Sequence, residues 1–253
     1  MINRFNRNMI LPLGGTLVAL IALLVVAFPG SNSTHAQLSC EDPFADVNIN
    51  FSPSGWTTDF CQTTIDMSEV ISGGVPRDGI PPIDNPIFDD VSVATQWLQP
   101  QSPVIVVEVE GEARAYPLSI LTRHEIVNDE IAGIPVAVTF CPLCNSAMVF
   151  DRRVDSETLR FGVSGNLRNS DLIMWDDVTE SWWQQLTGEG IVGEFAGTQL
   201  TILPSVVFGF GVFEERHPNG MVLSPETTGR TYGSNPYAGY DSRDPRTFLF
   251  RGE

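Results

Sequence analysis

One stretch indicates both the fold and the chemistry of this chain: Ile134-Pro135-Val136-Ala137-Val138-Thr139-Phe140-Cys141-Pro142-Leu143-Cys144. Residues 134–140 are mostly apolar or β-branched, which is typical of a buried strand. Directly after this strand come two thiols at C-x-x-C spacing, a pattern that indicates redox chemistry or metal binding. What the pair does depends on which other side chains reach the two sulfurs.

Short strands and turns surround this stretch. Residues 104–109 and 114–116 predict a β-hairpin, and 147–151 with 158–163 predict a second one. Further strands are expected at 172–175 and 199–203, and short helices at 117–127, 180–186 and 206–216. The sequence therefore predicts an α+β fold with an antiparallel-rich β-sheet and a few short helices, without the alternating βαβ pattern of a Rossmann domain.

The N-terminus resembles an export signal. Arg4 and Arg7 precede an apolar stretch at 9–28, and small residues follow up to Ala36. Two alternatives stay open for residues 1–36: a cleaved signal peptide, or an uncleaved signal anchor that spans the membrane. On either alternative the rest of the chain lies outside the cytoplasm, and this segment is the only expected contact with a membrane.

The charge of the chain excludes several classes of function. There are 31 acidic and 14 basic residues, a formal net charge of −17, so the average field repels nucleic acid. All the basic residues are Arg, and the absence of Lys excludes Schiff-base chemistry. No nucleic-acid partner is expected.

Residues 37–102 contain many turn-forming residues and are expected to be an irregular lead-in to a domain at 103–253. Cys40 and Cys61 lie within the lead-in. Because an exported protein folds in an oxidising compartment, we expect a Cys40–Cys61 disulfide that staples this segment. Cys141 and Cys144 then remain as a separate local pair.

The pair has three interpretations. A soft-metal site would use Cys141, Cys144 and an imidazole, with His124 the best-placed histidine and copper the most plausible ion. A thiol–disulfide enzyme would use Cys141 and Cys144 as its catalytic residues, although thioredoxin-type pairs open a helix and this pair precedes strand-like residues. The third interpretation is a structural disulfide that braces a non-enzymatic binding module.

Other residues are candidates for binding a small ligand. The polar stretch 164–171 contains Arg168 and Asn169, which would suit a carboxylate or a sugar, and Trp183 offers an aromatic platform. The alternative is that 164–171 is a loop between strands and that Trp183 is core. The ligand, or a redox partner, is not identified by these patterns.

Several long motifs resemble the bacterial and archaeal family catalogued as DUF 3179, a domain of unknown function. They lie at residues 111–121, 124–129, 133–136, 139–144, 161–165, 167–170, 185–188 and 232–233, and the resemblance covers roughly 103–240. The family has no established activity that the resemblance could imply. The resemblance does imply that His124, Cys141, Cys144 and Arg168 belong to signature segments and share one site. Members usually continue past the tyrosine-rich segment, so a C-terminally truncated domain is one of two alternatives.

Overall fold

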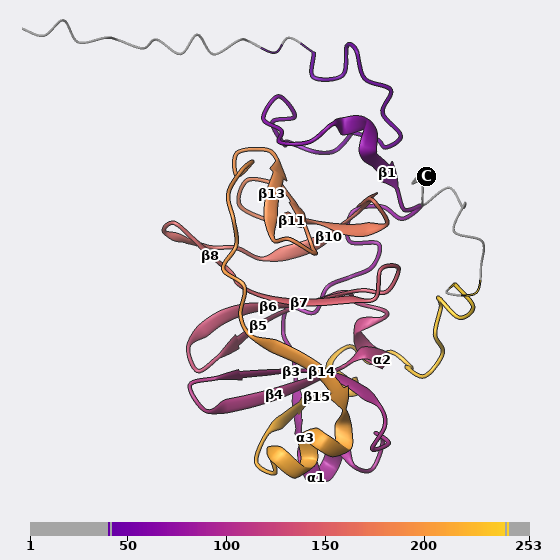
Figure 1. Cartoon of the computed structure of the whole chain (residues 1–253), viewed down its shortest axis with the longest axis vertical. Coiled ribbons are helices and arrows are strands. Elements are labelled where there is room, and N and C mark those ends of the chain that lie inside the picture. Colours follow the sequence, from indigo (N-terminus) through magenta and orange to yellow (C-terminus); the bar gives the residue numbers. More distant parts are fainter. Residues whose placement is uncertain (1–39, 41, 241, 243–253) are drawn as a thin grey trace, which may run out of the picture. The chain divides into compact units, whose positions relative to one another are not determined.

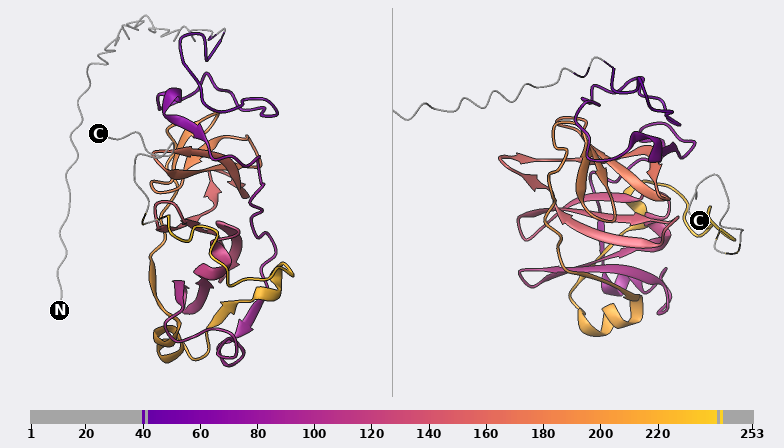
Figure 2. Two further views of the ribbon diagram at one scale, coloured as in Figure 1. Left: turned by 90° about the vertical axis from the view of Figure 1, so that its right-hand side faces the viewer. Right: turned by 45° about the horizontal axis from the view of Figure 1, so that its top comes forward.

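The computed structural model describes residues 40, 42–240 and 242, and these belong to one compact unit that starts at Cys40. It consists mostly of antiparallel β-sheets with a few short helices, as predicted. Figure 1 shows three sheets one above another, and Figure 2 gives two further views. The predicted N-terminal signal or anchor lies outside the described residues. Among those described, no helix is both long and apolar enough to cross a membrane.

The central sheet has three strands and contains the strand that precedes the C-x-x-C pair. Its antiparallel order is β5-β6-β7. The bounds are β5 (Ile126–Ile131), β6 (Ile134–Cys141) and β7 (Ser146–Asp151). Strand β6 confirms the predicted strand, extended by one residue to the first cysteine.

Two five-stranded sheets lie on either side of the central one. The first has the order β1-β10-β11-β12-β13, with β1 (Val70–Ser72), β10 (Phe161–Arg168), β11 (Asp171–Asp176), β12 (Trp182–Gln184) and β13 (Glu189–Val192). The second has the order β14-β3-β4-β15-β2, with β14 (Ser205–Gly209), β3 (Pro103–Val109), β4 (Glu112–Pro117), β15 (Met221–Leu223) and β2 (Phe88–Asp90). All these pairs are antiparallel except β15 with β4.

The remaining elements are short. They are β8 (Arg153–Val154), β9 (Glu157–Thr158), α1 (Val91–Ala94), α2 (Leu118–Leu121), α3 (Phe210–Arg216), η1 (Met67–Glu69) and η2 (Pro225–Thr227). Helices α1 and α3 lie at the outer side of the second five-stranded sheet (Figure 1) and share a core cluster with β3, β4 and β15.

The central sheet is buried on both faces. Val136 and Val138 of β6 pack into a core shared with β3 and β4, whereas Ala137 and Cys141 pack into a core shared with β10 and β11. This alternation follows from the two-residue period of a strand. It explains why β6 reads as a continuous apolar run rather than an alternating one, because both sets of side chains leave water. Each fully buried valine stabilises the fold by about 1.5–3 kcal/mol.

Two local predictions are confirmed. The hairpin at 104–116 is β3 with β4, which pair from Val104 with Pro117 to Val109 with Glu112. The Cys40–Cys61 disulfide is present. It belongs to a segment whose aromatic residues pack on the first five-stranded sheet, with Phe51 and Phe60 against Trp182.

Three helix predictions need correction. The helix expected at 117–127 ends at Leu121, because Glu125 adopts a left-handed backbone (φ 60°) and Ile126 begins β5. The helix expected at 180–186 is strand β12, in which Trp182 and Trp183 pair with β11. Of the helix expected at 206–216, the first part is β14 and only α3 is helical.

The second predicted hairpin is also wrong. Strand β7 pairs with β6, whereas residues 158–163 belong to β9 and to β10 of a different sheet. The strand expected at 199–203 is reduced to single bridges, from Gln199 to Glu189 and from Ile202 to Phe150. For the hairpin, β7 is the predicted strand but its partner differs, because pairing depends on tertiary packing.

Candidate functional site: a dithiol and a carboxylate

The C-x-x-C pair occupies the connection between β6 and β7. Cys141 is the last residue of β6, and its side chain is 1% exposed. It pairs with Ser146, so the residues between them form a hairpin loop that presents Cys144 as an exposed thiol. Asn145 has a positive φ of 50°, which this short polar side chain tolerates. The pair therefore does not open a helix, as a thioredoxin-type pair would.

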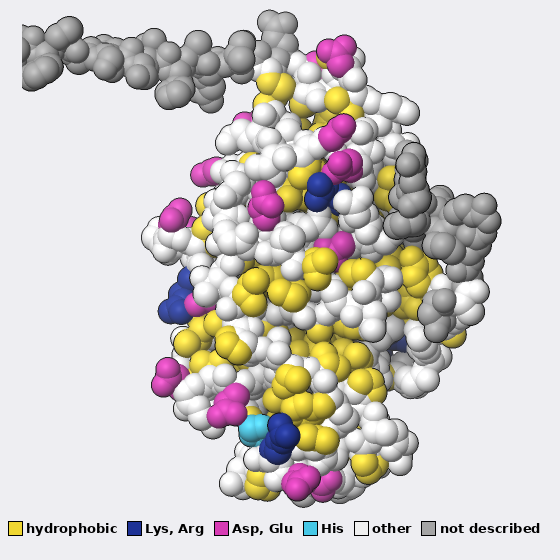
Figure 3. All heavy atoms as spheres, viewed as in Figure 1, with side chains coloured by type: hydrophobic (Ala, Val, Ile, Leu, Met, Phe, Trp, Pro, Cys, Tyr) yellow, Lys and Arg dark blue, Asp and Glu magenta, His cyan; other side chains and the backbone are white. Residues whose placement is uncertain are grey.

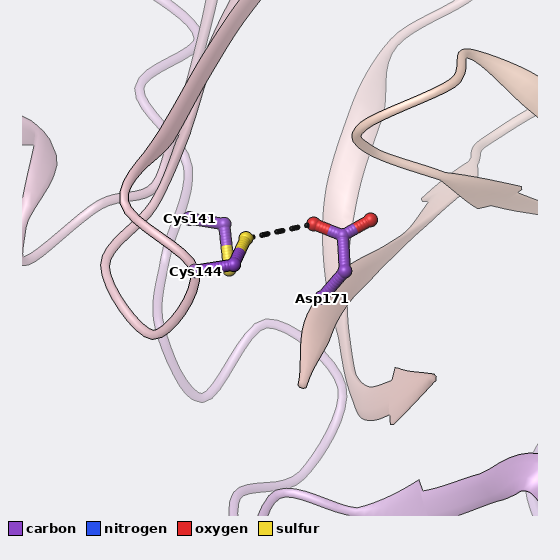
Figure 4. Close-up of side chains that lie close together, drawn as sticks. All are labelled: Cys141, Cys144 and Asp171. Atoms are coloured by element: carbon purple, nitrogen blue, oxygen red, sulfur yellow. Dashed lines mark hydrogen bonds between the residues drawn. The ribbon is translucent and has the colours of Figure 1, made fainter. Parts of the chain in front are cut away.

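A carboxylate from a neighbouring sheet meets the two sulfurs. Asp171 is the first residue of β11, and it follows a two-residue turn in which Asn169 and Ser170 both have positive φ. One donor atom from each of Cys141, Cys144 and Asp171 lies within 4.8 Å of the others. Figure 4 shows the Asp171 carboxylate pointing towards Cys144, whose Sγ lies 3.2 Å from Oδ1. This group could hold a metal ion.

The two thiols are electrostatically unequal. The hydrogen bond that Cys141 donates to Cys144, together with burial, raises the pKa of Cys141 well above its ordinary value. The same bond lowers the pKa of Cys144, and Ser146 adds to this, although burial and the Asp171 carboxylate oppose it. Of the two thiols, Cys144 therefore loses its proton more readily than Cys141.

Hydrogen bonds fix the orientation of the Asp171 carboxylate. Its Oδ2 accepts from the side-chain amide of Gln184 and, at 2.9 Å, from the backbone N–H of Leu186. Oδ1 is thereby left facing Cys144. Donors that hold one oxygen of a carboxylate while the other faces an ion are typical of the shell around metal ligands.

A second chain of hydrogen bonds supports the Cys144 side. The hydroxyl of Ser146 lies 3.0 Å from Cys144 Sγ and donates to Gln185 Oε1 at 2.7 Å. The amide of Gln185 donates to Thr139 Oγ1 at 2.9 Å. The loop that carries Cys144 is thus tied to β6 and to the segment after β12, and the two sulfurs are held by groups from two sheets.

His124, the predicted third ligand, is not part of this group. Its Nδ1–H donates to the backbone carbonyl of Pro81 at 2.7 Å, and its Nε2 accepts from the hydroxyl of Tyr232 at 2.8 Å. Burial lowers the pKa of His124, which favours the neutral ring that these two bonds require. The imidazole is therefore committed to structural partners, and the carboxylate of Asp171 takes the third position.

The predicted ligand-binding residues are engaged elsewhere. Trp183 is fully buried between Phe161 and Phe195, so it is a core residue rather than a surface platform. Arg168 is in β10 and donates to Glu69 at 2.6 Å, and it also donates at 3.4 Å to Gln184, the residue that holds Asp171, so it lies beside the group without being one of its donors. Asn169 is a turn residue. The polar stretch that the sequence singled out does contain Asp171, but nothing in its pattern indicated that this carboxylate reaches the cysteines.

Three consecutive residues beside the site bind the segment 232–240. Arg123 donates to the backbone carbonyl of Ser234 at 3.0 Å, and His124 accepts from Tyr232. Glu125 is 5% exposed and accepts from the Tyr237 hydroxyl at 3.1 Å, while burial raises its pKa to about 7. We call residues 232–240 the strap. Sequence reasoning missed Glu125, whose only signal was its place between His124 and a predicted helix end.

The fold and the site define a mostly antiparallel β protein with a dithiol–carboxylate group between two sheets. The chain belongs to the DUF3179 family, described as proteins of unknown function, whose model matches residues 77–253. A stretch of 111 residues is 29% identical to the DNA cross-link repair 1A protein of Gallus gallus, which amounts to 44% of this chain and 11% of that protein. No solved structure matches the chain.

Proposed function

We propose that this protein binds a thiophilic metal ion through Cys141, Cys144 and Asp171. The observation that supports this most directly is the convergence of three donor atoms within 4.8 Å. In a tetrahedral site with metal–sulfur bonds of about 2.3 Å, neighbouring ligand atoms lie roughly 3.8 Å apart. The spacing therefore leaves room for an ion after small adjustments of the side chains.

The donor set bears on the identity of the ion. Two thiolates suit both Cu⁺ and Zn²⁺, whereas a carboxylate oxygen is a common ligand of Zn²⁺ and a poor one for Cu⁺. Copper was the ion expected with His124. With Asp171 as the third ligand, Zn²⁺ is the better fit, and the exposed side of Cys144 leaves a fourth position open. Three protein ligands with an open position are typical of zinc sites that act on a substrate.

Metal loading of the full chain tests this proposal. Protein purified without a His tag is loaded with Zn²⁺ or, without oxygen, with Cu⁺, and its metal content is measured by mass spectrometry. We expect one ion per chain, lost in Cys144→Ser. Asp171→Asn should weaken Zn²⁺ strongly and Cu⁺ little, whereas Asp155→Asn, an exposed turn residue with a positive φ, is the matched control. Failure of both ions to bind would overturn the proposal.

The second candidate function is thiol–disulfide exchange, favoured by one observation. Cys144 is exposed, and the hydrogen bond from Cys141 lowers its pKa, as expected for an attacking sulfur. Here the roles would be opposite to those in thioredoxin, with the second cysteine attacking and the first resolving. The test is the reduction potential of the Cys141–Cys144 pair. A potential above about −300 mV supports this function, and a lower one marks a structural disulfide that does not exchange.

The proposal also covers the compartment in which the protein works and the partners that it meets there. We infer from the charged, apolar and small-residue regions of residues 1–36 that the protein is exported and works outside the cytoplasm. Its partners would then be a small ligand or a redox partner rather than nucleic acid, since the net charge is −17. Detection of the protein in the extracytoplasmic fraction of its host tests the first inference.

A further inference from the structure

A cavity of about 640 Å³ opens beside Cys144. Its walls come from α2, the loop between β6 and β7, and the strap. Figures 1 and 2 show the strap, in yellow, running past α2. The volume lies in the range of about 300–1,000 Å³ that small-molecule sites occupy.

The lining of the cavity has a definite chemical character. None of the described residues that line it carries an acidic or basic side chain. The contrast with the rest of the surface is sharp, because acidic side chains are scattered over the face seen in Figure 3 and the chain has 31 acids and 14 arginines. No cationic side chain of a described residue lines the cavity, and Cys144, whose sulfur lies 3.2 Å from the Asp171 carboxylate, brings negative charge to one wall. In the metal-free protein a phosphate or carboxylate ligand would therefore lose its hydration without gaining an ion pair.

The uncharged walls combine rings with neutral hydrogen-bonding groups. Phe140, Tyr237 and Tyr240 contribute aromatic rings, while Ser119 and Asn145 contribute a hydroxyl and an amide. Aromatic rings bind flat apolar groups by stacking and edge contacts, and a few neutral polar groups then orient the ligand.

The strap wall is attached by side chains rather than by strand pairing. Its bonds to Arg123, His124 and Glu125 place Tyr237 against a buried carboxyl group. Tyr237 and Leu143 also line a smaller cavity of about 180 Å³, whose other walls include the apolar Val163 and Leu172 and the polar Glu125 and Asn166. The two cavities thus share Tyr237 and Leu143.

We propose that the cavity beside Cys144 binds an uncharged organic molecule with an aromatic ring, held against the strap tyrosines. This inference deepens the proposed function and rests on it in one respect, namely that a donor atom of the bound molecule would occupy the open position of the ion at Cys144. The recognition itself depends only on the cavity walls and is testable without metal.

Three maleimides, each corrected for its intrinsic reactivity, test the inference on the reduced, metal-free full chain. N-Phenylmaleimide is uncharged and aromatic, N-ethylmaleimide is uncharged and small, and N-(4-carboxyphenyl)maleimide is aromatic and anionic. Each rate at Cys144, located by peptide mass spectrometry, is divided by the rate with glutathione. We expect the phenyl reagent to exceed both others by about tenfold, and its rate to saturate with concentration, as ring contacts would produce.

Variants of the strap identify the source of the preference. Tyr240→Ala should reduce the phenyl preference severalfold, whereas Tyr240→Phe, which keeps the ring, should retain it. Equal corrected rates for the three reagents, an anionic reagent as fast as the phenyl one, or a Cys144 that none of them modifies would each overturn the inference. Because metal is absent from this assay, a failure here leaves the metal stoichiometry unaffected, and a failure of metal binding leaves the reagent preference unaffected.

Discussion

The buried carboxyl group of Glu125 makes the stability of this protein depend on pH. Glu125 is 5% exposed, its partner is the Tyr237 hydroxyl, and burial raises its pKa from 4.5 to about 7. In the unfolded chain the same group ionises near 4.5. The difference, about 2.5, multiplied by roughly 1.36 kcal/mol per pKa unit, gives about 3 kcal/mol.

The sign follows from which state holds the proton. Below pH 4.5 Glu125 is protonated in both states, and the stability that it contributes is fully present. Between 4.5 and about 7 the folded state keeps a proton that the unfolded state releases, so the free energy of unfolding falls as pH rises. Above about 7 both states are ionised and the loss, about 3 kcal/mol, is complete.

Glu125→Gln isolates this effect, because glutamine keeps an acceptor for Tyr237 and cannot ionise. Unfolding by urea is measured from pH 4.5 to 9 on metal-free protein. We expect variant and parent to match near pH 4.5 and the variant to be more stable by about 3 kcal/mol at pH 8. Glu130→Gln, which removes an exposed carboxylate from β5, the strand that follows Glu125, should not reproduce this. A Glu125→Gln difference that is constant across the pH range would refute the reasoning.

Three other changes test the site and its frame. Gln184→Met removes the amide that holds Asp171 and should weaken zinc affinity by about 10–100-fold in a chelator competition; an unchanged affinity contradicts the assignment. Gly165→Ala places a Cβ 2.1 Å from a backbone oxygen at φ 82°, and it should lower the unfolding free energy by more than about 3 kcal/mol. Gly111→Ala is the control: its φ is similar, but the new Cβ meets open space, so the loss should be about 1 kcal/mol. Cys40→Ser breaks a disulfide of sequence separation 21 and should lower the unfolding free energy by about 3 kcal/mol in urea titrations.

Local features were predictable from the sequence because they depend on neighbouring residues. The strand before Cys141 and the hairpin of β3 and β4 follow from β-propensity and turn residues. The Cys40–Cys61 pair follows from composition and compartment. The strand that contains Trp182 was expected to be helical, since its residues have no alternation of polar and apolar types. Both faces of that strand are buried, and burial by other elements is invisible in a local pattern.

The ligand set could not be predicted for a related reason. Asp171 lies 27 residues beyond Cys144, in a strand of another sheet. The loop after β6 and the turn before β11 meet only because the two sheets stack with the C-terminal end of β6 beside the N-terminal end of β11. A one-residue change in the pairing register of β11 would move Asp171 to the opposite face of its sheet. His124, the histidine expected to join the cysteines, instead bonds to Pro81 and Tyr232, and neither contact is visible in the local sequence pattern.

The proposed metal ion would remove the electrostatic cost of ionising this group. Fully ionised, the two sulfurs and the Asp171 carboxylate would carry three negative charges within 4.8 Å of one another. Each repulsion at about 4 Å costs roughly 1 kcal/mol in water and about 4 kcal/mol near a protein surface. Asp171 already has two N–H donors on its other oxygen, but they neutralise no net charge. A dication between the donors converts the three repulsions into three attractions, whereas without one the buried sulfur keeps its proton and only Cys144 is available for chemistry.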